Sequence, residues 1–96
     1  MCNAIRRVNH AISISHEAWE RIASVFGLAR REAEVLKCIV SDQHENDIAV
    51  SLGLSRHTVR TYLKRLRLKL GVHSRVAMVK RVLVEHSTLG GESNPP

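Results

Sequence analysis

Three glycines divide the middle of this sequence into segments whose apolar residues recur at the spacing of an α-helix. They are Gly27, Gly53 and Gly71, and each comes directly after an apolar stretch, where glycine in a left-handed conformation commonly ends a helix. Within these segments the apolar residues return every three or four positions, and no segment shows the alternation of a half-buried β-strand. The sequence therefore predicts an all-α fold, a small helical bundle.

Caps and apolar stripes give the approximate bounds of the predicted helices. The first helix follows Ser15, a typical N-cap residue, and ends at Gly27, with Trp19 on its apolar stripe. Residues 1–14 are weakly patterned and are expected to form a short helix or a loose arm, whereas the Gly, Ser and Pro content of residues 87–96 predicts a disordered tail. The remaining helices are expected over about 30–41, 45–52, 56–70 and 75–86.

The class of protein follows from length and composition. A chain of 96 residues suits one domain, and its aromatic content of 3% against 44% hydrophobic residues predicts an aliphatic core. No apolar run approaches the roughly 18 residues that span a bilayer, so we expect a soluble, cytoplasmic protein without a membrane partner. Cys2 and Cys38 stand far apart and outside any metal-ligand spacing, so neither a disulfide nor a metal is expected.

Positive charge is concentrated in one half of the chain. The net charge is +6, and between Asp47 and Glu85 there are nine basic residues and no acidic residue. The remainder holds the other six bases and all nine acids, a net charge of −3. A small protein with one cationic half is suited to bind a polyanion such as nucleic acid.

The segment around Gly53 has the pattern of a helix-turn-helix. Two helices that cross steeply need a small residue at the contact, a turn residue that tolerates positive φ, and a branched apolar residue on the second helix. Ala49, Gly53 and Val59 stand at the corresponding positions, and Ser55 is placed to cap the second helix. This spacing predicts a helix that enters the major groove of double-stranded DNA.

The two faces of the predicted helix 56–70 differ in chemistry. Val59, Leu63, Leu66 and Leu70 share the face directed at the core, at about 100° per residue. Base edges need directional hydrogen-bond donors, whereas the walls of the groove are phosphates that need positive charge. The opposite face predicts base contacts by His57, Arg60, Thr61 and Lys64. The flanks predict phosphate contacts by Arg56, Arg67, Thr58, Arg65 and Lys69.

Glu32 is the acidic residue whose position most needs an explanation. By helical angle it lies on the buried stripe of the helix 30–41, between Leu36 and Ile39. A carboxylate there is costly unless it is paired, so we expect a structural ion pair with Lys69 or Arg75, or hydrogen bonds from backbone amides. A role in acid–base catalysis is not expected.

The last predicted helix has an apolar arc of roughly 160°, wider than packing on one core requires. It consists of Val76, Met78, Val79, Val82 and Leu83. Two interpretations are equally open: a dimer contact that pairs two recognition helices on a two-fold DNA site, or packing of this helix against residues 1–26.

Several of these motifs together resemble the LuxR/GerE-type DNA-binding domain. The similarity runs without a gap from about Leu28 to Val79, and the departures include Ala29 in place of a usual Thr or Ser cap and Asp42 in place of a favoured Gly. The residues that carry the resemblance are LARREAEVL at 28–36, Ile48-Ala49 with Leu52, Leu54-Ser55 with Thr58-Val59-Arg60, Lys69–Val72, and Ser74-Arg75.

The resemblance implies a four-helix domain whose third helix enters the major groove and whose last helix forms a homodimer on DNA. It implies base contacts by Arg60, Thr61 and Lys64, and phosphate contacts around Ser55, Thr58 and Lys69. We therefore expect residues 28–86 to be the DNA-binding domain, preceded by an arm and helix at 1–27 and followed by the tail at 87–96. RNA polymerase is a further candidate partner, and the expected location is the bacterial cytoplasm, at the nucleoid when bound.

Three functions are compared at this stage. The first is a sequence-specific transcription regulator, either a stand-alone protein or an excised output domain. The second is an interaction module that dimerises with related regulators and modulates them. The third, an enzyme, is not expected, because the six histidines are dispersed and no phosphate loop, nucleophile motif or zinc-binding helix occurs; no cofactor is expected either.

Overall fold

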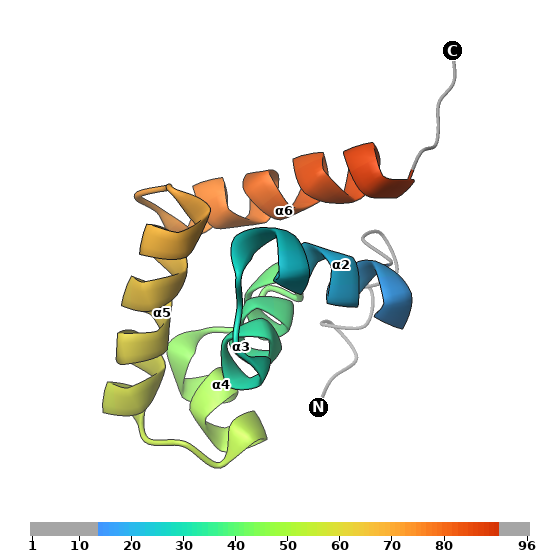
Figure 1. Ribbon diagram of the computed structural model, residues 1–96. Helices are drawn as coiled ribbons and strands as arrows, with labels where there is room; N and C mark the ends of the chain where they lie inside the picture. Colours follow the sequence, from blue (N-terminus) through green and yellow to red (C-terminus); the bar gives the residue numbers. More distant parts are fainter. Residues whose placement is uncertain (1–13, 91–96) are drawn as a thin grey trace.

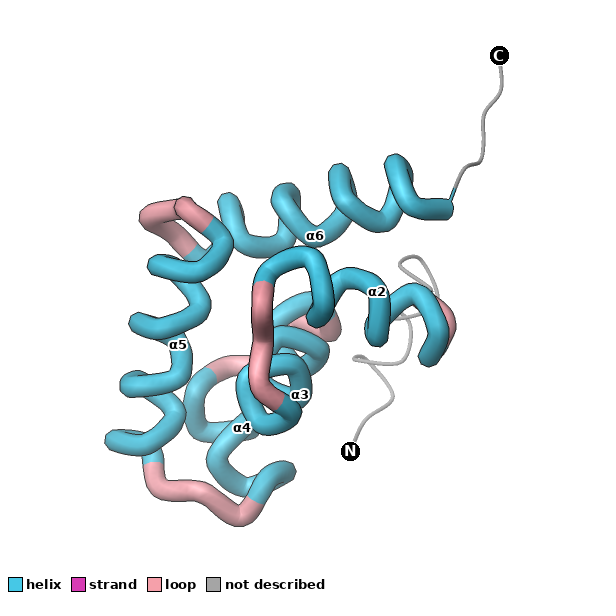
Figure 2. The backbone as a smooth tube through the Cα atoms, in the orientation of Figure 1, coloured by secondary structure: helices cyan, strands magenta, loops and turns pink. Residues whose placement is uncertain are grey.

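The computed structural model describes residues 14–90 as five helices without a strand in that range, which confirms the all-α prediction. Figure 1 shows α5 along one edge of the molecule, α6 across one end and α2 beside α6. Short loops join the helices (Figure 2). The helices are α2 (His16–Phe26), α3 (Arg30–Val40), α4 (Glu45–Leu52), α5 (Arg56–Leu70) and α6 (Arg75–Gly90).

The last helix is longer than the sequence predicted. It ends at Gly90 rather than near His86, so residues 87–90 are helical and not part of a tail. Ser87 and Thr88 are tolerated in a final helical turn, and the first strong breakers are the glycines that follow. The short helix or arm expected over 1–14 and the tail beyond residue 90 lie, apart from Ile14, outside the described residues.

Helix starts use two kinds of cap. Ser15, Ser55 and Ser74 each accept a hydrogen bond at Oγ from a backbone amide three residues later, over 3.0–3.1 Å. Neither Ala29 nor His44 caps its helix through its own side chain. Their backbone amides instead donate to carboxylates three residues ahead, over 2.8 Å for Ala29 and 3.4 Å for His44. The N-cap amide of each of these two helices is therefore paired, although neither helix has a side-chain cap of its own.

The core is the aliphatic cluster that the composition predicted. The stripe of α5 faces inward, with Val59 and Leu66 fully buried, and α5 packs against α3 and α4. Val35 of α3, which the sequence analysis did not place inward, is also fully buried. From the other side α2 supplies Trp19 and Ile22 and packs against α6. One continuous core therefore holds the inner face of α5 in place.

An ion pair between a buried carboxylate and a more exposed lysine ties α3 to the end of α5. Glu32 Oε1 lies 2.7 Å from Lys69 Nζ and accepts the amide of Ala29, and Lys69 also donates to the carbonyl of Gly27 over 2.9 Å. Burial alone would raise the pKa of the Glu32 carboxyl, but the hydrogen bonds from Lys69 and Ala29 outweigh it and hold that pKa below its ordinary value.

The pairing of Glu32 with Arg75, the other expected partner, is not found. The guanidinium of Arg75 donates instead to the backbone carbonyl of Gln43, in the loop between α3 and α4. Arg75 is the first residue of α6, and from there it reaches a carbonyl of the loop that follows α3. Carbonyls at the end of a helix have no partner within the helix and need another donor.

Candidate nucleic-acid interface

The outward face of α5 carries the four side chains expected to meet base edges. All four are exposed, and together they line one shallow hollow of about 280 Å³. Its lining is His57, Arg60, Thr61 and Lys64. The helix period places them on one side because the leucine stripe of α5 occupies the other. A continuous polar and cationic surface of this kind can offer donors to a polyanion without rearrangement of the core.

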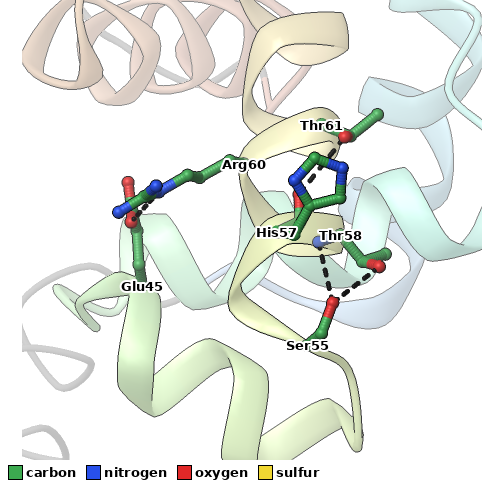
Figure 3. Close-up of polar contacts among 6 residues, drawn as sticks. All are labelled: Glu45, Ser55, His57, Thr58, Arg60 and Thr61. Atoms are coloured by element: carbon green, nitrogen blue, oxygen red, sulfur yellow. Dashed lines mark hydrogen bonds and ion pairs between the residues drawn. The ribbon is translucent and has the colours of Figure 1, made fainter.

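The first turn of α5 is fixed by local hydrogen bonds (Figure 3). Ser55 Oγ accepts the amide of Thr58 over 3.0 Å and donates to Thr58 Oγ1 over 2.9 Å. Thr61 Oγ1 donates to the carbonyl of His57 over 3.2 Å. The backbone amides of this turn form the positive end of the helix dipole, which favours an anion nearby.

The residues expected to contact phosphates differ from one another in their exposure and in their contacts. Arg56 is exposed and lines a polar hollow of about 390 Å³ together with residues of α4 and α6. Arg65 is exposed and stacks with its guanidinium 5.7 Å from the ring centre of Tyr62, whereas Arg67 and Thr58 are half-buried. Lys69 is the exception, because its ammonium group is held by Glu32 and Gly27.

Sequence reasoning missed one residue of this surface. Glu45, the first residue of α4, lies with Oε1 3.0 Å from Nε of Arg60 (Figure 3). The two residues stand 15 positions apart on different helices, so no periodic pattern links them. Only the crossing of α4 and α5 brings the carboxylate to the guanidinium.

The apolar arc of α6 is divided between two environments. Met78 and Val82 are at most 1% exposed and belong to the core that α6 shares with α2, and Val79 is half-buried against it. Val76 and Leu83 remain 64% and 37% exposed. Packing on α2 therefore accounts for part of the arc, and a smaller apolar surface is left on its outer side.

The described residues, 14–90, also bear on metal, thiol and membrane-spanning features. Within residues 14–90 no three His, Cys, Asp or Glu side chains are arranged to hold a metal ion. Burial raises the pKa of the Cys38 thiol, and the nearby Glu34 adds to this, which disfavours the reactive thiolate. Among the described helices none is long and apolar enough to cross a membrane.

Comparison with known proteins agrees with this geometry. Residues 27–82 match the GerE family, described as bacterial regulatory proteins of the luxR family. The chain belongs to the LuxR family. The match covers α3, α4, α5 and the first half of α6, and therefore includes the helix-turn-helix and its supporting core. The LuxR family consists of transcription regulators rather than enzymes, and DNA binding is implied by membership.

Three curated relatives are similar to this LuxR-type chain. The uncharacterized response regulatory protein YgeK of Escherichia coli is 36% identical over 72 residues, covering 71% of this chain and 49% of YgeK. The transcriptional regulatory protein FixJ of Azorhizobium caulinodans is 32% identical over 79 residues, covering 82% of this chain and 36% of FixJ. The HTH-type transcriptional activator RamA of Corynebacterium glutamicum is 34% identical over 59 residues, covering 62% of this chain and 21% of RamA.

The LuxR-type chain therefore spans less than half the length of each of these relatives. No solved structure gives a significant match to it.

Proposed function

We propose that this LuxR-type domain is a sequence-specific DNA-binding module of a transcription regulator that reads the major groove with α5. The single observation that carries the proposal is the hollow on α5 lined by His57, Arg60, Thr61 and Lys64. An α-helix with its side chains is about 10–12 Å across, and the major groove, about 12 Å wide, admits it.

The distribution of charge on α5 also supports binding of DNA by this face of the helix. Arg56 and Arg65 are exposed on the two flanks of this face, where the phosphate backbones would lie. Arg60 and Lys64 stand between them, and both can donate to the O6 and N7 acceptors of guanine. Lys69 would also face the phosphates on one flank, but its ammonium group is shared with the ion pair to Glu32, so a phosphate contact there competes with that pair.

Selection from a random duplex library with the purified chain tests the proposal directly. We expect one preferred site, bound with an affinity that falls steeply with salt as counterions are released. Arg60→Ala and Lys64→Ala should each cost about 1–3 kcal/mol on that site and relax the preference at one base position.

Arg30→Ala is the matched control, because it removes the same charge from a side chain of α3 that is 95% exposed. It should leave the base preference unchanged. If Arg60→Ala and Lys64→Ala bind the selected site as the wild type does, α5 is not the reading helix.

A further inference from the structure

An ion pair joins the two helices of the helix-turn-helix at the proposed reading surface. Arg60 Nε lies 3.0 Å from Glu45 Oε1, and the side chains are 61% and 36% exposed. Figure 3 shows the Arg60 side chain reaching from α5 to the first turn of α4. The guanidinium is therefore held to one side by a residue of the neighbouring helix.

This contact leaves the terminal nitrogens of the Arg60 guanidinium available to bind a base. Arginine has five N–H donors in a rigid plane, and one contact through Nε restrains the plane without using both terminal nitrogens. The terminal nitrogens can still form the paired hydrogen bonds that arginine makes with O6 and N7 of guanine. Restraint before binding also lowers the entropy that the side chain loses when it meets a base.

Glu45 stands in the first turn of α4, where the helix dipole favours an acid, but its carboxylate does not cap the helix by a hydrogen bond. The carboxylate that accepts the backbone amide of His44 is that of Asp47, and the Glu45 carboxylate contacts Arg60 instead. Glu45 also lines the polar hollow that includes Arg56, a residue proposed to meet phosphate. If DNA binds as proposed, a carboxylate in that place should repel the phosphate backbone and lower the affinity for every sequence.

We propose that Glu45 is a positioning residue for base recognition, which orients the guanidinium of Arg60 toward a guanine. The proposal rests on the function proposed above and deepens it by naming what gives Arg60 its selectivity. Glu45 acts through Arg60 and does not itself touch a base. An exposed ion pair is weak in water, but the groove excludes water around it, which strengthens the interaction in the bound state.

The two effects of the carboxylate predict changes of opposite sign for Glu45→Gln. Without the negative charge, affinity for random duplex DNA should rise severalfold. Without the restraint on Arg60, the preference for guanine over the other three bases at its position should fall about 10-fold, a fraction of what one paired contact can supply. A loss of fold would lower both quantities together.

The experiment measures binding of the purified chain to the selected duplex, to its three single-base variants at the Arg60 position, and to random duplex. Glu34→Gln is the matched control, because Glu34 is paired with Arg31 over 2.7 Å on α3 and its replacement changes the net charge equally. The control should keep the guanine preference, and thermal unfolding should show that both variants are folded.

A double-mutant cycle isolates the coupling. In the Arg60→Ala background, Glu45→Gln should no longer change the base preference, because the residue that it orients is gone. A change that persists there would mean that Glu45 reads a base itself, which would overturn the proposal.

The remaining outcomes separate this inference from the function on which it rests. If Arg60→Ala abolishes the guanine preference while Glu45→Gln retains it, Arg60 reads the base without help and the positioning role is wrong. If Arg60→Ala leaves base preference intact, the reading surface itself has been misassigned.

Discussion

The side chain of Glu32 shows how a single charge is accommodated in a small aliphatic core. It is 4% exposed, and the amide of Ala29 and the ammonium of Lys69 both donate to the same carboxylate oxygen. Lys69 is more exposed than Glu32, so water screens its end of the pair. Breaking such a pair destabilises chiefly because the buried charge that remains has lost its partner.

Lys69→Met should lower the free energy of unfolding by about 2 kcal/mol at pH 7, less than for a fully buried pair because Lys69 is partly exposed. The pKa of Glu32 is lowered in the folded state, so the stabilisation is present above the ordinary carboxyl pKa and is lost as the pH falls through the folded value. The difference between wild type and variant should therefore shrink below about pH 4.

Urea denaturation at a series of pH values measures this difference. Lys80→Met, on the exposed side of α6, is the matched control and should change stability little at any pH. If the loss of stability in Lys69→Met stayed constant from pH 7 to pH 3, the ion pair could not be its cause.

The turn between α4 and α5 decides the angle at which the reading helix is presented. Gly53 has φ +67°, and the amide of Leu54 donates to the carbonyl of Ala49 over 2.9 Å. A Cβ built on Gly53 would meet no heavy atom within 4 Å. The requirement for glycine is therefore conformational rather than steric, since other L residues are strained in the left-handed region.

Gly53→Ala should destabilise the fold by about 1 kcal/mol, the cost of holding alanine in the left-handed region. Gly53→Asn should cost less, because asparagine is tolerated there. Chemical denaturation of the three proteins gives the order directly. Equal stability of the alanine and glycine forms would contradict a requirement for glycine at this position.

In the assembly of the helices, α6 has a buried side and an exposed side. Met78 and Val82 pack in the core shared with α2, while Val76 and Leu83 lie seven residues apart on the outer part of the helix. We propose that this outer surface pairs two copies of the chain on DNA, so that two α5 helices read the two halves of a symmetric site. Only Val76 and Leu83 of the predicted arc are exposed, which favours a dimer that forms on DNA rather than in solution.

Replacing both Val76 and Leu83 with Glu should reduce affinity for a two-fold symmetric duplex at least 10-fold and leave affinity for a single half-site nearly unchanged, because only the paired contact is removed. Binding titrations with both duplexes, together with sedimentation of the complexes, provide the measurement. Val25→Glu, which alters an apolar residue of α2 that is 51% exposed, serves as the control. Cooperative binding by the double variant would rule out this surface as the dimer contact.

Much of this architecture depends on local relations that a sequence displays. The bounds of α4 and α5, the leucine stripe of α5 and its opposite polar face follow from caps, glycines and a period of 3.6 residues. These features link residues within a few positions of one another. Membership in the LuxR family follows from the same local motifs, because they recur at fixed spacing.

Which residues of different helices become partners depends on how the helices pack in the folded protein. Lys69 rather than Arg75 meets Glu32 across 37 positions of sequence, and Glu45 meets Arg60 across 15. The sequence offers several basic residues as partners for each carboxylate, and only the crossing of α3, α4 and α5 brings one of them close. The same is true of Met78 and Val82, whose burial depends on where α2 lies. Helical periodicity specifies a face, whereas the partner of that face is fixed by the arrangement of the other helices.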